Sequence, residues 1–376
     1  MSNWTIKLNG KQFDRWKSFS FSRAIKDNVG KFNLVSSDKN PKDSPLAGND
    51  KIEIFYKEQK CFTGFVDTVA VKGGRDGGSI IQFDGRDPLC DVVDSSLPDK
   101  AKSKKGGLTL VATIEAVFKA LGIDGIKIID KTKDKLGNKT VKLQKTGDSG
   151  TNAMDYLAEL AASLQVWLIS DEDGNLNIFR AGDVAANMEF YYLLNGKGKN
   201  NILDASLEID LSQVFAKIKV RGKGSIAFDV SPKDAADLVD INGEHFDDWA
   251  RPARYLEVKS DDIKTKAQAQ QRAKDEVNSR RAKAFVYRVE TNIFTDKDGK
   301  IFSLGQTMQI NDEARQVSGK HIIGEFAVNF DRESGTQTSI TFAPSEAYQI
   351  VDIDQRQEKA GQTKKHIKKQ AKAKAK

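Results

Sequence analysis

Strand-like segments on both sides of a helical middle are the feature that most restricts the fold of this 376-residue chain. The segments are short, they alternate in part between apolar and polar residues, and turns containing glycine or aspartate separate them. The early segments cover Trp4–Leu8, 31–35, Lys51–Tyr56, 61–71 and 79–83. The later segments cover 205–220, Phe285–Thr291, 301–304, 306–310, 321–330 and 336–342. Closely spaced strands of this kind are typical of small barrels and sandwiches, so we predict a mainly β protein of the α+β class.

The middle of the chain changes to a helical period. Between Thr109 and Gly122, apolar residues recur every three or four positions, which predicts an amphipathic helix that Thr109 caps and Gly122 ends. A second helix is expected after Thr151, and it runs into a β-hairpin that ends at Arg180. A third helix, 264–281, is polar and rich in alanine, so we expect it to pack against small residues.

The formal net charge of +7 originates at the C-terminus. Eight lysines with no acid among them follow Glu358, and subtracting them from +7 leaves −1 for the rest of the chain. Such a cationic end can contact phosphate or an assembly partner, and four of its lysines are the candidates for these contacts: Lys364, Lys365, Lys368 and Lys369. The same composition is typical of a disordered solubilising extension, so both interpretations stay open.

Residue patterns that support catalysis are scarce. The three histidines lack the HExxH spacing of zinc proteases, and the chain contains no GxSxG nucleophile motif. Cys61 and Cys90 are expected to be buried free thiols. Acidic turns beginning at Asp171 and Asp296 lack the glycine and glutamate positions of an EF-hand loop, so we predict hairpin turns there. We therefore expect no catalytic residue, no metal and no cofactor, and the lack of a long apolar stretch predicts no membrane contact.

The segment 83–96 combines a strand exit with paired charges in the sequence FDGRDPLCDVVDSS. Gly85 permits a sharp exit from the strand, and Arg86 can pair with Asp91 or Asp94 across one helical turn. The segment resembles the GRD-x3-D-[LV]-V-D-x-S segment of baseplate hub proteins from contractile-tailed phages, in particular the Mu-like tail protein family.

Two further segments resemble the same family in the same order. Residues 147–182 are similar to its helix-plus-hairpin unit, including the D-x-D-G-N-L turn. Residues Lys266–Ala284 are similar to its late helix, with charged residues at the matching positions Arg272, Glu276, Arg280 and Arg281. That helix usually carries a tryptophan before the glutamate, where Asp275 stands here, so its local packing is expected to differ.

This resemblance implies a structural hub without catalysis. In the family, each subunit contributes two tube-type β-barrels, and three subunits form a ring that joins the sixfold tail tube to the threefold central spike around a DNA channel. The partners implied are further copies of the chain in a homotrimer, the tail tube protein and the central spike protein, with tape-measure and baseplate wedge proteins as additional ones. The implied location is the virion, after assembly in the host cytoplasm, with DNA passing only transiently.

The family's organisation also predicts domain limits in this chain. The predicted parts are a first barrel, an α/β domain, a second barrel in two pieces, an insertion within the second barrel, and a lysine-rich tail: 1–95, 96–185, 186–225 with 284–347, 226–283, and 348–376, respectively.

Two other functions stay open. A tail-associated cell-wall hydrolase is one, because such hubs can carry lytic domains, although no motif here supports it. Nucleic-acid binding through the C-terminal lysines is the other, and it would depend on phosphate contacts because no aromatic residue accompanies these lysines.

Overall fold

The computed structural model describes residues 3–38, 47–74, 78–101, 108–140, 150–164, 166–196, 200–222, 242–260, 266–344 and 347. The chain divides into two compact units. Unit 1 comprises Met1–Leu207 with Val286–Ser345, and unit 2 comprises Glu208–Phe285 with Glu346–Lys376. Among the described residues, strands outnumber helices in both units, so the prediction of a mainly β fold is confirmed.

The N-terminal part of unit 1 is an antiparallel sheet. Its strands alternate between buried and partly exposed residues, as β1 shows with Trp4, Ile6 and Leu8 buried. In the sheet the strands follow the order β3-β4-β7-β6-β5-β1-β2. Their bounds are β1 Trp4–Leu8, β2 Lys11–Phe13, β3 Trp16–Ala24, β4 Lys31–Asp38, β5 Lys51–Tyr56, β6 Gln59–Gly74 and β7 Gly78–Arg86.

The C-terminal part of unit 1 contributes strands from two separate stretches of sequence. They are β11 Ala185–Tyr192, β12 Asp204–Ile209, β16 Phe285–Thr291, β17 Thr307–Asp312, β18 Val317–Asp331 and β19 Gly335–Ala343. The order β12-β16-β19-β18 continues the sheet, β17 pairs with β18, and β11 pairs with β17 in parallel.

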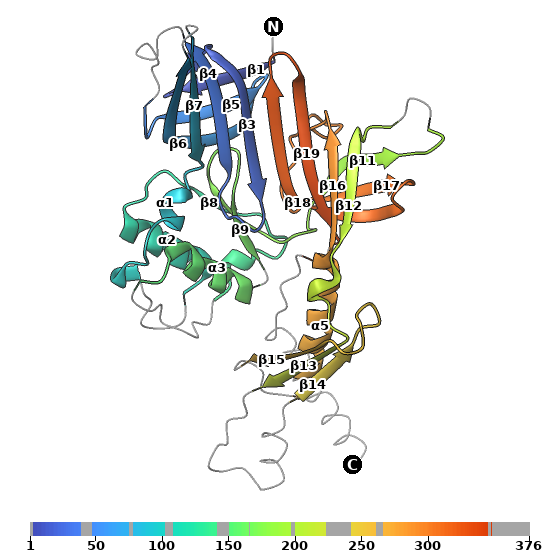
Figure 1. The fold of residues 1–376 in the computed structure, drawn as a ribbon. Helices are drawn as coiled ribbons and strands as arrows, with labels where there is room; N and C mark the ends of the chain where they lie inside the picture. Colours follow the sequence, from blue (N-terminus) through green and yellow to red (C-terminus); the bar gives the residue numbers. More distant parts are fainter. Residues whose placement is uncertain are drawn as a thin grey trace, which may run out of the picture. The chain divides into compact units, whose positions relative to one another are not determined.

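A seam between β3 and β18 joins the two parts into one sheet of thirteen strands (Figure 1). The pairing is antiparallel and runs without interruption from Ala24 opposite Glu325 to Ser18 opposite Asp331. Within the described residues these ladders make an open sheet, and they close no barrel.

Aromatic side chains form the core beneath this seam. Trp4 packs against Phe19 and Phe294 with ring centroids 5.0 Å apart in both pairs, and Phe19 stacks on Phe330 at 5.5 Å. Because Phe19 belongs to β3 and Phe330 to β18, the apolar contacts cross the seam together with the backbone ladder. The two strand-rich parts therefore share one core. Its aromatic side chains bury much apolar area and so contribute strongly to the stability of the seam.

A smaller α/β module follows β7 in unit 1. Its elements are α1 Cys90–Val93, α2 Leu110–Leu121, α3 Ala153–Ser163, β8 Ile128–Asp130, β9 Trp167–Ser170 and β10 Leu176–Phe179, with strand order β8-β10-β9. Helix α2 has the predicted ends, because the Thr109 side chain accepts a hydrogen bond from Ala112 N and Gly122 has a φ of 72°. Helix α3 begins one residue later than Thr151 suggests, with Asn152 as the N-cap.

Unit 2 places one helix on a three-stranded sheet. The elements are β13 Lys217–Gly222, β14 Asn242–Phe246, β15 Tyr255–Ser260 and α5 Lys266–Ala284, with strand order β14-β13-β15. Ala269, Ala273 and Val277 of α5 pack on Ile218 and Val220. These small helix residues let α5 lie close to the sheet, as its polar, alanine-rich sequence predicts.

Several strands differ from the predictions. The segment 301–304 forms only an isolated bridge at Ile301, and 205–220 is two strands separated by a 3-10 turn at Leu211–Gln213. Six strands were not expected from the sequence: β2, β3, β8, β11, β14 and β15.

Candidate functional site

The predicted Gly85–Asp94 motif fixes the end of β7 to α1. A Cβ on Gly85 would lie 2.0 Å from the carbonyl oxygen of Phe65, so only glycine fits between these strands. The Arg86 guanidinium binds the Asp94 carboxylate through two hydrogen bonds, of 2.9 and 2.7 Å, and donates a third from Nε to Asp67 at 2.7 Å. These bonds from Arg86 hold the pKa of Asp94 below its usual range. Of the two acids that the sequence offered to Arg86, the structure brings Asp94 to it.

Asp91 lies apart from this ion pair. Its backbone carbonyl accepts a hydrogen bond from Ser95 Oγ at 2.5 Å. Its carboxylate lies 3.8 Å from the Cys90 sulfur.

Asp87, which the sequence analysis did not select, is a buried polar centre of unit 1. Its carboxylate accepts hydrogen bonds from Gly30 N, Ser170 Oγ and Leu89 N. Burial raises the pKa of this carboxyl, although the hydrogen bonds from Ser170 and Gly30 oppose the effect. Asp87 thus connects the loop before β4, the start of α1 and the end of β9.

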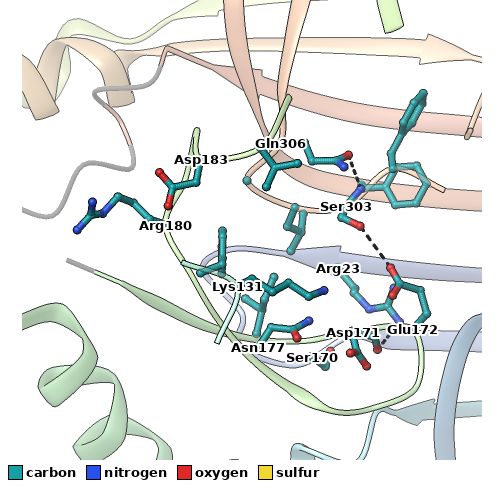
Figure 2. Close-up of a pocket in the computed structure, with 17 residues that line it drawn as sticks. Arg23, Lys131, Ser170, Asp171, Glu172, Asn177, Arg180, Asp183, Ser303 and Gln306 are labelled. Carbon is teal, nitrogen blue, oxygen red and sulfur yellow. Dashed lines mark hydrogen bonds between the residues drawn. The ribbon is translucent and has the colours of Figure 1, made fainter. Parts of the chain in front are cut away.

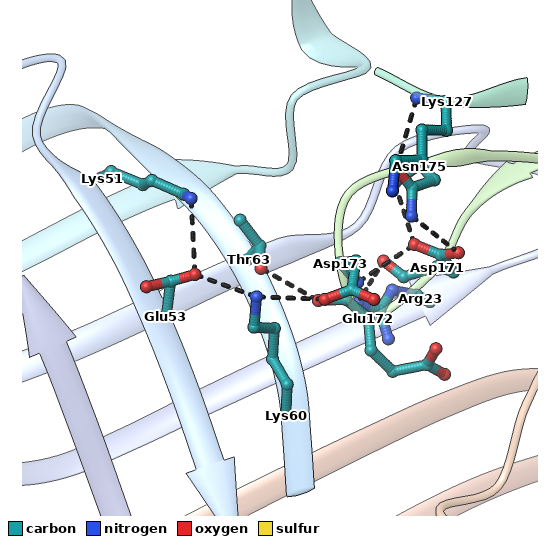
Figure 3. A network of polar contacts seen from close by, with 10 residues as sticks. All are labelled: Arg23, Lys51, Glu53, Lys60, Thr63, Lys127, Asp171, Glu172, Asp173 and Asn175. Carbon is teal, nitrogen blue, oxygen red and sulfur yellow. Dashed lines mark hydrogen bonds and ion pairs between the residues drawn. The ribbon is translucent and has the colours of Figure 1, made fainter. Parts of the chain in front are cut away.

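The turn between β9 and β10 docks on the N-terminal sheet through contacts that we call the hairpin joint (Figure 3). The members of the hairpin joint are Arg23, Lys60, Thr63, Asp171, Glu172 and Asp173. Arg23 Nη2 donates to the Asp171 carbonyl at 3.0 Å, and Thr63 Oγ1 donates to the Glu172 carbonyl at 3.0 Å. Lys60 Nζ lies 3.0 Å from both Asp173 Oδ1 and Glu53 Oε1.

The acidic residues of this turn stabilise the turn itself. Asp171 Oδ1 accepts hydrogen bonds from the backbone N–H groups of Asp173 and Asn175, at 3.0 and 2.8 Å. Asp296 does the same for Asp298 and Lys300. Both segments are hairpin turns, as predicted.

A cavity of about 170 Å³ lies beside the hairpin joint (Figure 2). Residues of β9, β10 and the 302–306 segment line it, together with Arg23 and Phe326.

The predicted charged residues of α5 lie within unit 2. Glu276 accepts from Arg272 at 2.6 Å and from Arg280 at 3.3 Å, so these three form one row along the helix. Arg281 lies outside the row and binds the buried Asp247 carboxylate at 2.5 Å. Its guanidinium also stacks 5.0 Å from the Trp249 ring. The row and the Arg281 contacts hold α5 and the β14–β15 connection in place.

Exposed apolar side chains occur at several places in the described chain, and two of these places involve sheet strands that could bind a partner. In unit 2, Phe246, Lys217 and Tyr255 form one cross-strand row on the sheet face opposite α5, with Phe246 67% and Tyr255 49% exposed. In unit 1, Leu203 is 64% exposed next to β12, the strand at one end of the sheet order. Exposed apolar groups beside a strand edge are typical of protein-binding surfaces.

Two backbone hydrogen bonds flank β12. Leu203 N donates to the Glu290 carbonyl and Asp210 N donates to the Ala284 carbonyl, both at 2.9 Å. The two donors are an odd number of positions apart, so the alternation of N–H directions is interrupted between them.

The two cysteines are buried and protonated. Burial raises the thiol pKa of both Cys61 and Cys90 to about 12, so these thiols stay protonated. No group of three or more histidine, cysteine or acidic residues that could hold a metal occurs in the described ranges. The helices of the described parts include none that is long and apolar enough to cross a membrane. The candidate lysines Lys364, Lys365, Lys368 and Lys369 lie outside the described residues.

Comparison with known proteins matches almost the whole chain. Baseplate hub protein gp44 of Escherichia phage Mu is 24% identical over 365 residues, which cover 95% of this chain and 92% of the Mu protein. The chain is a relative of the Mu-like baseplate hub and tail proteins. The resemblance predicted from its three segments is thus confirmed. No family model matches the chain.

Two solved tail proteins share the fold of this chain. The 43 kDa tail protein of prophage MuSo2 from Shewanella oneidensis has a TM-score of 0.76 at 20% identity, over 93% of this chain and 99% of that one. The tail protein from Neisseria meningitidis MC58 has a TM-score of 0.73 at 17% identity, over 92% and 99%. The similarity therefore spans both units of the chain.

Proposed function

We propose that this protein is a structural component of a phage baseplate, the hub that joins the tail tube to the central spike and leaves a channel for DNA. The observation that carries the proposal is the match to a baseplate hub protein over 95% of this chain. The protonated thiols and the structural use of the paired acids agree with a role without catalysis.

The proposed assembly is a homotrimer in which each subunit supplies two tube-type barrels to a ring. Two observations support it: strand-rich parts lie on both sides of the β3–β18 seam, and β12 has β16 as its one ladder partner among the described strands. An exposed strand edge is stabilised when another chain pairs with it. We propose that the outer edge of β12 is used in this way.

The predicted domain limits remain part of this proposal. The limits are 1–95, 96–185, 186–225 with 284–347, the insertion 226–283, and the tail 348–376. The role of the tail as a solubilising, docking or phosphate-binding extension also stays a prediction.

The proposed partners are the tail tube protein and the central spike protein, with tape-measure and wedge proteins as further candidates. The proposed location is the virion, after assembly in the host cytoplasm. Exposed apolar residues at Leu203 and Phe246 offer surfaces for such partners.

Light scattering of the full chain, alone and with tube and spike proteins, tests the assembly. We expect three times the mass of one chain for the parent. Leu203→Lys places a charge on the exposed apolar side chain beside β12 and should yield monomers, whereas Val71→Lys, at an exposed position on β6, is the control and should stay trimeric. A parent that stays monomeric at high concentration and binds neither partner would overturn the proposed hub function, and a trimeric Leu203→Lys would overturn the use of β12. Clearing of peptidoglycan in a zymogram would instead establish the hydrolase alternative.

A further inference from the structure

The cavity beside the hairpin joint has the size of a small-molecule site. Its volume is about 170 Å³, and Phe179, Phe302, Phe326 and Leu304 provide apolar walls. An engineered cavity of about 150 Å³ in another protein holds one benzene molecule. A single ring or a short aliphatic chain therefore fits here.

Arg23 supplies a buried positive charge to this cavity. The residue is 7% exposed, its Nη atoms donate to the carbonyls of Cys61 and Asp171, and its guanidinium lies 4.9 Å from the Phe62 ring. No carboxylate of the described chain lies within ion-pair distance of it, and its Nε has no hydrogen-bond partner there. The buried Asp87 carboxyl interacts with Arg23 electrostatically, but beyond ion-pair distance. The charge of Arg23 is therefore only partly compensated, and an anionic group beside it would be favoured.

Two further polar side chains face the same space. Asn177 is 3% exposed and lines the cavity, and its Oδ1 has no partner in the described chain. Since the two ends of an amide are assigned from their neighbours, Asn177 can offer a donor or an acceptor. Lys131 extends across Asn177 toward Arg23 in Figure 2.

The acids near the cavity have other partners. Asp171 Oδ1 accepts backbone N–H groups of its own turn. Glu172 Oε1 lies 3.4 Å from Ser303 Oγ, and Asp183 Oδ2 accepts from Lys133 N at 3.4 Å. These contacts fix the positions of the three acids without removing their charge. Arg23 and Lys131 line the same cavity and make no ion pair among the described residues, so they are the cations available to an incoming anion.

We propose that this cavity binds a carboxylate carried on a small apolar group, with the apolar group between the aromatic walls and the carboxylate at Arg23 and Lys131. The carboxylate can belong to a free small acid or to the C-terminus of a polypeptide that ends in an apolar residue. The site lies within unit 1, and its occupancy does not depend on the proposed role in the baseplate.

Calorimetric titration of the full chain with phenylacetate tests the proposal, with neutral 2-phenylacetamide as the matched ligand. We expect phenylacetate to bind at least tenfold more tightly than the amide, and Lys131→Ala to weaken phenylacetate several-fold. A peptide ending in phenylalanine, with a free or an amidated C-terminus, distinguishes the two sources. Binding of the free peptide alone assigns the site to a chain end, and binding of phenylacetate assigns it to a small acid.

Arg23 also belongs to the hairpin joint, so its substitution could disturb the fold as well as the cavity. A variant at another residue of the cavity is therefore needed. Val184 lines the cavity and is 51% exposed, and Val184→Trp should block entry while the fold is retained. Val71 is 54% exposed on β6 and outside the cavity lining, so Val71→Trp is the control and should bind normally. Equal affinity for phenylacetate and its amide, unchanged binding in Val184→Trp, or no binding of any probe would overturn the proposal.

Discussion

Gly85→Ala tests the claim that β6 and β7 need a glycine at their closest approach. The new Cβ would lie 2.0 Å from the Phe65 carbonyl oxygen and 2.5 Å from the Phe32 ring, whereas real Cβ contacts are essentially never shorter than 3.0 Å. The oxygen must therefore move by at least about 1 Å, although it belongs to a paired strand. Forced overpacking of a core costs about 1–3 kcal/mol and sometimes more, and we expect about 3 kcal/mol here because backbone has to move.

Hydrogen exchange in the folded protein measures this loss locally. A loss of about 3 kcal/mol should speed exchange of the slowest β6 and β7 amides roughly 150-fold. Gly48→Ala is the matched control, because no atom lies within 4 Å of its added Cβ and its φ is not positive. We expect that control to remain within about 0.5 kcal/mol of the parent. Exchange in Gly85→Ala within threefold of the parent would refute the reasoning.

Two further variants test buried charges. The pKa of Asp87 is higher in the folded state than in the unfolded state, so the folded state binds the proton more tightly. The protonated Asp87 carboxyl therefore contributes fully to stability below about pH 4, and this contribution is lost as pH rises toward the folded pKa. The difference in unfolding free energy between the parent and Asp87→Asn should therefore change between pH 4 and 8, and a constant difference would contradict the raised pKa. Arg281→Met leaves the buried Asp247 carboxylate without its cation and should destabilise unit 2 by about 3 kcal/mol in urea unfolding. Arg251→Met, at an exposed position, is the control, and equal effects of the two variants would show that the Arg281 contact is not structural.

Local signals in the sequence predicted local structure well. Helix α2 has the predicted ends because the cap side chain and the left-handed glycine act within one turn of the helix. The seam could not be predicted in this way, because the second ladder partner of β3, after the nearby β4, is β18, about 300 residues away in sequence. The alternation of Phe19 and Phe21 with serines was a usable signal for a strand, but it did not identify the partner.

In the candidate site, too, contacts between residues close in sequence were predicted, whereas contacts between distant segments were not. The sequence suggested Asp91 or Asp94 as the partner of Arg86, and in the structure Arg86 binds Asp94 and also Asp67, which the sequence did not suggest. Arg23 and Asp87 were missed because their significance comes from burial between segments distant in sequence. The 205–220 segment was predicted as one strand because its apolar residues continue through Leu211–Gln213, where the Asp210 carboxylate instead accepts Ser212 N and starts a 3-10 turn.

The β3–β18 seam also determines when the sheet of unit 1 can be completed during synthesis. Trp4 Nε1 donates to Thr336 Oγ1 across 332 residues, so this contact and the β3–β18 ladder can form only after nearly the whole unit has been synthesised. At about 5–20 residues per second, the N-terminal strands wait roughly 15–65 s for their partners. During that time the β3 edge is open to other nascent chains, and its serines at 18, 20 and 22 lower the apolar content of the waiting strand. The sheet can therefore be completed only late in synthesis, and a chain that stops before β18 retains an open β3 edge that can pair with another chain.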